Sequence, residues 1–150
     1  MTERQPAAAT KISCEVYASL AQPAEAALSA LGIGAVLQHS RRALALRERA
    51  PLPWLPPGTR LEQDPVEVFE VYVPRAAARG VLLAWARALQ VFTPGRGTIY
   101  AEEVELLAPP GLELAHDGLA APDETARPGE RLAPLTLINC VLQRGRADEV

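Results

Sequence analysis

The chain has 150 residues, the usual size of a single domain and enough to bury a core. Its 15 basic and 18 acidic side chains give a formal net charge of −3, which excludes the basic excess typical of nucleic-acid-binding proteins. Residues 1–10 are polar and rich in alanine, and no run of about 18 apolar residues occurs. We therefore expect a cytoplasmic protein without a signal peptide or a membrane span.

The first elements follow from residue spacing. Residues 1–10 are predicted to be a flexible leader. Apolar and polar residues alternate over 11–20, which predicts a strand. Pro23 in a first turn, followed by leucines three residues apart, predicts a helix that ends at Gly32. A second strand is predicted over residues 35–39.

Residues 40–64 differ in kind, because they combine five arginines with several prolines. This composition predicts a long structureless insertion, and such loops in compact domains are usually functional or disordered. Trp54 lies in the middle of it, flanked by prolines. Two interpretations of Trp54 stay open: a local packing anchor, or a contact for a partner.

The second half repeats the pattern. Residues 66–73 (VEVFEVYV) are rich in β-forming side chains and predict a strand. Apolar residues at helical spacing predict a helix over 76–92, and residues 98–107 predict a strand. The order is therefore βαββαβ, which predicts an α+β, ferredoxin-like fold with a four-stranded antiparallel sheet and two helices on one face. We expect a second copy to cover the other face.

The loop between the last helix and the last strand, Thr93-Pro94-Gly95-Arg96-Gly97-Thr98, combines two glycines with an arginine. Glycines allow a tight bend that exposes backbone N–H groups, and a guanidinium between them adds a cationic fork. Phosphate groups need such donors. Pro-Gly also marks ordinary turns, so both interpretations stay open.

No residue pattern for catalysis or metal binding is visible. His39 and His116 are isolated, and Cys14 and Cys140 lie in separate apolar runs, where we expect buried thiols. The glutamates of residues 102–105 are expected to form a solvated face. We predict that the protein is not an enzyme and holds no metal.

The C-terminal part has a different composition. Residues 109–134 contain Pro, Gly and acidic residues without periodicity, which predicts a linker. Residues 135–150 (LTLINCVLQRGRADEV) predict an extra strand and the start of a helix.

Several of these features together resemble a known family. They are Val73-Pro74-Arg75 before a helix, the loop Pro94-Gly95-Arg96-Gly97, and Arg47-Glu48-Arg49 in a long insertion between the second and third strands. Residues 11–108 resemble the PII-like signalling proteins, in particular the divergent type associated with membrane transporters. Residues 135–150 are similar to the start of another PII-like module.

The resemblance implies a homotrimer that binds nucleotide between neighbouring subunits. It also implies a T-loop, here residues 40–64, that controls a membrane transporter for inorganic carbon or a metal. The expected ligand is an adenine nucleotide (ATP, ADP, AMP or a cyclic nucleotide), with bicarbonate as a further candidate. The resemblance implies these nucleotide contacts: Val36, Leu37, Arg47, Arg49, Gly95, Arg96, Gly97 and Thr98. It implies partner contacts from Trp54 and Arg60.

Two departures from the family are visible. Residues 108–117 contain no Arg or Lys, so the second phosphate clamp of the nitrogen regulators has no match. The T-loop carries no tyrosine of the kind that is uridylylated, and no match to the lysine and glutamine that help to bind 2-oxoglutarate. We therefore expect weakened nucleotide binding and no 2-oxoglutarate sensing. The alternative function is a trimeric ferredoxin-like assembly or a CutA-type metal-binding protein without a nucleotide response.

Overall fold

The structure is a computed structural model that describes residues 7–34, 36–48, 58–107 and 125–136. A short 3-10 turn links the first strand to the first helix. The elements are β1 (Ala7–Tyr17), the turn Ala18–Leu20, α1 (Ala21–Ala30), β2 (Leu37–Glu48), β3 (Thr59–Pro74), α2 (Arg75–Leu89) and β4 (Thr98–Leu106). No helix of the described segments is long and apolar enough to cross a membrane.

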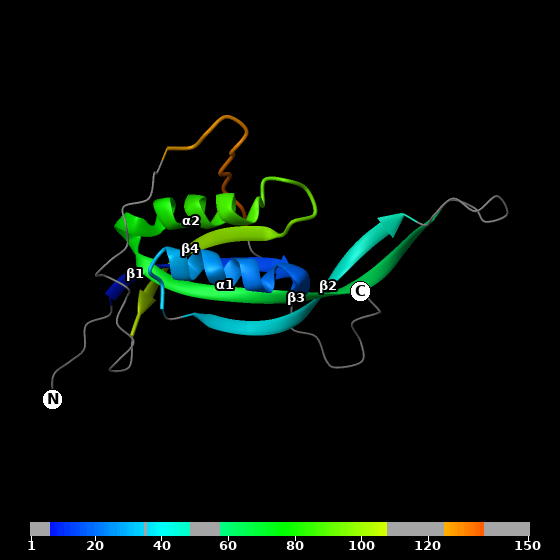
Figure 1. Ribbon diagram of the computed structural model, residues 1–150, viewed down its shortest axis with the longest axis horizontal. Coiled ribbons are helices and arrows are strands. Elements are labelled where there is room, and N and C mark those ends of the chain that lie inside the picture. The colour runs from blue at the N-terminus through cyan, green and yellow to red at the C-terminus, as the bar shows by residue number, and fades with distance from the viewer. Residues whose placement is uncertain (1–6, 35, 49–57, 108–124, 137–150) are drawn as a thin grey trace.

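The predicted fold is confirmed. The four strands form one sheet in the order β2-β3-β1-β4, and every neighbouring pair is antiparallel. Both helices pack on the same face of this sheet (Figure 1), so the arrangement is ferredoxin-like. The predicted leader is wrong for residues 7–10, which begin β1. Ala9 and Thr10 are buried there because they pair with β3 and β4 at the same time.

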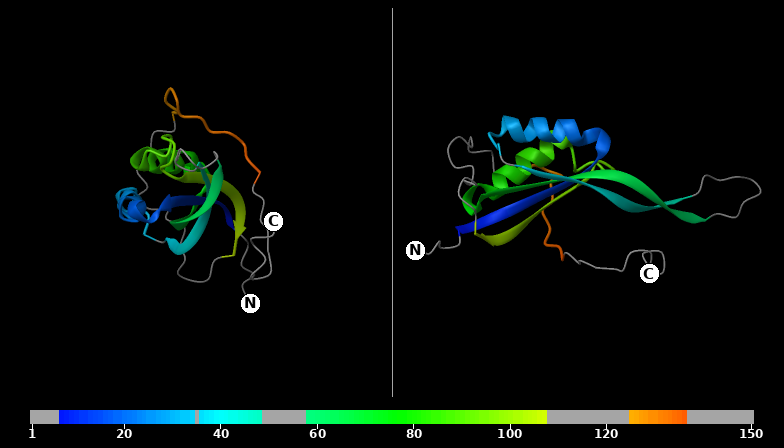
Figure 2. Two further views of the ribbon diagram at one scale, coloured as in Figure 1. Left: turned by 90° about the vertical axis from the view of Figure 1, so that its right-hand side faces the viewer. Right: turned by 90° about the horizontal axis from the view of Figure 1, so that it is seen from below.

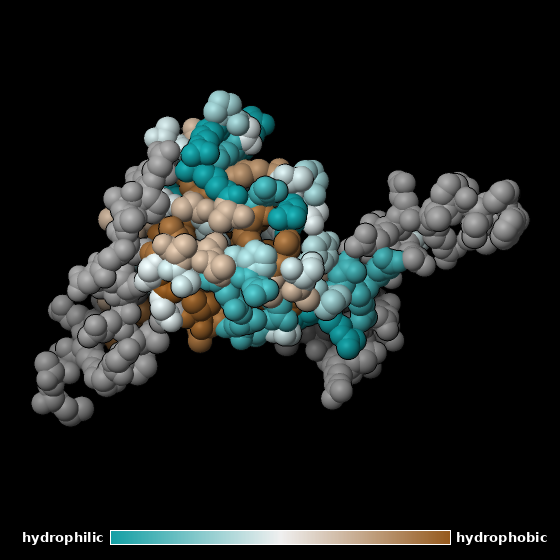
Figure 3. Space-filling view, in the orientation of Figure 1, coloured by the Kyte–Doolittle hydropathy of each residue, from teal (hydrophilic) through white to brown (hydrophobic). Residues whose placement is uncertain are grey.

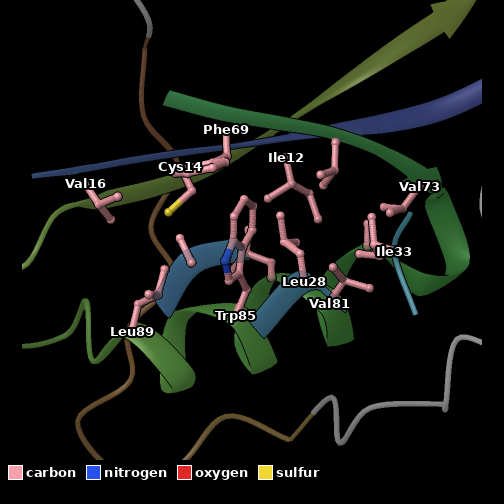
Figure 4. Close-up of a cluster of buried hydrophobic side chains, with 14 residues drawn as sticks. Ile12, Cys14, Val16, Leu28, Ile33, Phe69, Val73, Val81, Trp85 and Leu89 are labelled. Carbon is pink, nitrogen blue, oxygen red and sulfur yellow. The ribbon is translucent and has the colours of Figure 1, made fainter. Parts of the chain in front are cut away.

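The core lies between the helices and the apolar side of the sheet. Figure 4 shows Ile12 and Cys14 of β1 and Phe69 of β3 directed towards Trp85 of α2 and Leu28 of α1. Trp85 is fully buried and meets Phe69 edge to face, with 6.5 Å between ring centroids. This geometry adds roughly 0.5–1.5 kcal/mol to the burial of both rings. The α2 periodicity that placed Trp85 inward is thus confirmed.

Cys14 is one of these core residues. Its burial raises the pKa of the thiol to about 12, so the side chain behaves as a small apolar group. The prediction of a buried thiol is confirmed for Cys14, while Cys140 lies outside the described residues.

The prediction of a structureless insertion over residues 40–64 is wrong. β2 and β3 stay paired far beyond the rest of the sheet, from Leu37 opposite Glu70 to Glu48 opposite Thr59. We call the part that extends past β1, residues 42–48 paired with 59–65, the ribbon (Figures 1 and 2). Only residues 49–57 of the predicted insertion lie outside the described residues.

The arginines and prolines led to a wrong prediction because two strands can pair along their backbones without the continuous apolar pattern of a buried strand. Figure 3 shows the described base of the ribbon as largely hydrophilic. Side chains also bond across the two strands. Ser40 Oγ donates to Glu67 Oε1 at 2.7 Å just before the ribbon begins, and Arg42 Nη1 donates to Gln63 Oε1 at 3.2 Å within it. Pro65 is tolerated because it lies one residue beyond the last β1 partner, where β3 has an open edge.

The predicted linker is also corrected. Residues 125–136, which we call the strap, are held against α2 by Arg87. Its Nε and Nη2 donate to the two carboxylate oxygens of Glu130 at 2.8 Å each, and Nη2 also donates to the carbonyl of Thr125 at 2.6 Å. The Arg87 and Glu130 side chains are only 16% and 10% exposed. Residues 109–124 and 137–150, which include most of the predicted extra strand and the helix start, lie outside the described residues.

Gly97 ties the connection between α2 and β4 to the central strand. Its φ is 140°, and a Cβ at this position would collide with the carbonyl oxygen of Glu15 and approach Val16 Cγ1 to 2.9 Å. Only glycine therefore allows β4 to start this close to β1.

We predict that Gly97→Ala lowers the free energy of unfolding by roughly 2–4 kcal/mol, because it combines positive-φ strain with a backbone collision. Gly95→Ala is the matched control, since Gly95 has a φ of 82° but nothing within 4 Å of an added Cβ. It should cost only about 1 kcal/mol. Urea denaturation of both variants provides the measurement. Equal losses would show that the contact with β1 does not constrain position 97.

We also predict that acid releases the strap. Hydrogen bonds from Arg87, then from the Arg127 N–H, lower the pKa of Glu130 from 4.5 to about 2. The carboxylate therefore stabilises the docked strap above pH 4.5, and this contribution is lost as the pH falls towards 2. The protection factors of the Arg127 and Glu130 amides, which are corrected for the intrinsic exchange rate at each pH, should fall across this range.

Glu130→Gln should show the lower protection already at neutral pH, with Glu105→Gln as the exposed control. Exchange in the core around Trp85 separates strap release from global unfolding. Unchanged strap protection in Glu130→Gln would contradict the prediction.

Candidate nucleotide-binding site

The glycine loop, residues 93–98, follows the C-terminal end of α2. Gln90 adopts a left-handed conformation with φ 56°, and its N–H bonds back to the carbonyls of Ala86 and Arg87. The loop then closes a turn in which the Arg96 N–H donates to the Thr93 carbonyl at 3.3 Å. Gly95 and Gly97 both have positive φ, so the glycines supply the tight bend that the sequence predicted.

Arg96 has a partner that its sequence position did not predict. Its Nε donates to the carbonyl oxygen of Leu89 at 3.2 Å, in the last turn of α2. A cation here satisfies a terminal carbonyl and opposes the negative end of the helix dipole. The contact holds the guanidinium beside the loop, where Gly95 and Thr98 are exposed.

The structure places the predicted base-binding residues at the opposite edge of the sheet. Thr98 lies opposite Glu15, Glu15 opposite Val68, and Val68 opposite His39. This row therefore crosses three strand spacings, roughly 14 Å, from β4 to β2. Leu37 is two residues from His39 along β2 and is 54% exposed, whereas Val36 packs against the core.

The predicted arginines of the insertion lie farther away. Arg47 lies on the ribbon, where its backbone is opposite Arg60, and it is eight residues along β2 from His39. At about 3.3 Å per residue this is roughly 26 Å from the row that contains Thr98. Within one chain, Arg47 is therefore not beside the glycine loop. Its expected approach to the nucleotide concerns a site between subunits and stays a prediction. Arg49 and Trp54 lie outside the described residues.

The structure also reveals a polar network that the sequence did not predict. It lies on the side of the sheet away from the helices, which we call the helix-free face, and which includes Lys11, Ser13, Glu15, Val68, Glu70 and Glu102. Lys11 Nζ lies 2.7 Å from Glu102 Oε2 and 3.8 Å from Glu70 Oε1. The hydrogen bond to Glu102 is the main cause that raises the pKa of Lys11.

Two uncharged side chains on this face each have a buried polar atom without a hydrogen-bond partner among the described residues. Ser13 Oγ and His39 Nε2 are buried in the described structure without a partner. Buried polar atoms of this kind usually find a partner in protein or water. Alternation over residues 11–15 indicated a polar side of the strand, but which charged side chains meet there depends on the order of the strands.

No three acidic, His or Cys side chains of the described ranges gather closely enough to hold a metal ion.

Comparison with known proteins supports the fold. No protein-family model matches the sequence, and no curated protein shows significant sequence similarity to it. The chain is similar to Bacillus subtilis GlnK in complex with ATP, with 14% identity, a TM-score of 0.51, and coverage of 65% of this chain and 84% of that one.

A second B. subtilis GlnK structure matches with the same identity and TM-score and is covered to 86%. Arabidopsis thaliana PII bound to citrate follows at 16% identity and a TM-score of 0.46, with coverage of 65% of this chain and 75% of that one. The chain thus has the ferredoxin-like fold found in PII proteins.

Proposed function

We propose that this protein is a non-enzymatic, PII-like regulator that binds an adenine nucleotide at residues 93–98. The observation that supports this most is the position of the glycine loop. It joins α2 to β4 in a sheet that also carries a long β2–β3 ribbon, and the fold is shared with a GlnK structure solved with ATP. The ligand class is ATP, ADP, AMP or a cyclic nucleotide, with bicarbonate as a further candidate.

The loop has the chemistry for a phosphate group. Gly95 is exposed and has open space around it, so a phosphate can approach its backbone closely. Thr98 adds a hydroxyl, and the contact with Leu89 positions the Arg96 guanidinium before ligand arrives. A positioned cation loses little entropy on binding, which favours charge-assisted bonds to phosphate.

We propose that the complete site lies between subunits of a homotrimer. The glycine loop and Leu37 occupy opposite edges of one sheet, so a neighbouring chain is the natural source of the second wall. Exposed Leu37 fits a base contact from that neighbour.

We propose that the ribbon and its tip engage a partner protein, with a membrane transporter as the expected class. The ribbon projects from the sheet (Figure 2), and Leu44 on it is 59% exposed. An exposed leucine among arginines suits a protein contact that buries apolar surface and reads charge. Arg60 lies on the same ribbon, and Trp54 is proposed as a contact at its tip.

The first test is thermal stability with ATP, ADP, AMP, cyclic AMP and bicarbonate. A ligand at 100 times its Kd should stabilise the fold by about 2.7 kcal/mol. Arg96→Ala should lower the stability of the free protein by roughly 0.5–1 kcal/mol, because α2 loses its terminal cation. It should in addition shrink the ligand-induced shift, which is measured against the same variant without ligand.

Arg42→Ala is the control, since it removes a ribbon guanidinium that bonds Gln63 and leaves the loop intact. If no nucleotide raises the melting temperature at millimolar concentrations, the sensor function is wrong. The assembly alternative would then be favoured.

Analytical ultracentrifugation should give a trimer, and a monomer at the same concentration would remove the proposed site between subunits.

A further inference from the structure

A cavity lies between α2, β4 and the strap, and no nucleotide function accounts for it. Its volume is about 750 Å³, within the range of roughly 300–1,000 Å³ typical of small-molecule sites. α2 forms one wall, the edge strand β4 a second, and strap residues 131–135 a third. Figure 2 shows the strap, in orange, crossing from α2 towards β4.

One face of α2 lines the cavity, with residues 75, 78, 79 and 82 at i, i+3, i+4 and i+7 spacing. Part of the cavity wall is apolar. Leu82 on this face and Ile99 on β4 line the cavity, and Leu132 and Leu135 of the strap add two leucines that are 44% and 61% exposed. A ligand with an apolar body would remove this surface from water.

The other part is charged, with Arg75, Arg79 and Arg131 against Glu102 and Glu103. Glu102 is engaged by Lys11 at 2.7 Å. Glu103 is 74% exposed and lies 3.7 Å from Arg75, a loose contact that a ligand anion can replace. Arg131 has no ion pair with any residue that the structure describes. The Arg75 and Arg131 guanidinium groups can therefore bind a carboxylate.

We propose that this cavity binds a small organic carboxylate with an aliphatic body. Arg131 and Arg75 hold the carboxylate, and Leu82, Ile99 and Leu132 cover the chain. The strap supplies both a cation and an apolar wall, so the Arg87–Glu130 contact that docks it also completes the cavity. This site is separate from residues 93–98 and does not depend on nucleotide binding.

The test is calorimetric titration of the full chain with octanoate, alongside acetate and 1-octanol. Octanoate should bind saturably with one site per chain and shift the amide signals of Ala101 and Ala133. Acetate lacks the apolar body and 1-octanol lacks the charge, so each should bind at least about tenfold more weakly. Equal binding of octanoate and 1-octanol would overturn the proposal, as would the absence of saturable octanoate binding.

Three substitutions in the strap avoid the core. Arg131→Gln should weaken octanoate binding on the order of tenfold, because a charge-assisted pair is lost. Arg127→Gln is the matched control on the same strap, since Arg127 does not line the cavity, and it should bind like the original chain. Ala133→Trp should fill the cavity and abolish binding. Unchanged affinity in both Arg131→Gln and Ala133→Trp would overturn the proposed site, whatever the nucleotide titrations show.

Discussion

The pairing of β1 on both of its edges is the constraint on which the rest of the structure depends. β3 and β4 add to opposite sides of this strand, and its apolar side chains provide the middle of the core. Trp85 and Leu28 can be buried only because Ile12 and Cys14 meet them there. The backbone of β1 also sets the path of the glycine loop, since Gly97 packs on the carbonyl of Glu15.

That constraint divides the molecule into parts with different physical roles. The helix side of the sheet is apolar and closed, whereas the helix-free face carries Lys11 between two carboxylates and buried polar atoms without partners. The ribbon extends past β1, and its two strands pair only with each other. On β3, the core residues lie where the strand pairs with β1, whereas the ribbon is the part of β2 and β3 that extends beyond β1.

Arginine illustrates how one residue type serves several purposes. Arg96 satisfies the carbonyl of Leu89 and at the same time brings charge to the glycine loop. Arg87 is nearly buried and bonds both oxygens of Glu130, so its role is to dock the strap. Arg47 and Arg60 lie opposite each other in the backbone register of the ribbon, away from the glycine loop and from the strap. Only the folded surroundings distinguish these roles, because all four side chains have the same donors.

Local periodicity in the sequence was sufficient to predict the succession of strands and helices along the chain, the inward face of α2 and the turn at Gly95 and Gly97. Those features arise from backbone geometry over a few residues, which sequence spacing records directly. The ribbon was missed because the arginines and prolines of residues 40–64 were taken as the mark of a loop, although Leu44 and Leu46 alternate along β2 and Leu61 lies opposite Leu46.

The tertiary structure decided which distant residues contact each other. Arg87 reaches Glu130 across 43 residues, and Lys11 joins carboxylates on two neighbouring strands. It also decided that the glycine loop and Leu37 lie at opposite edges of the sheet. Such contacts depend on strand order and register, which are set by the whole fold and leave no mark in the local spacing of residues.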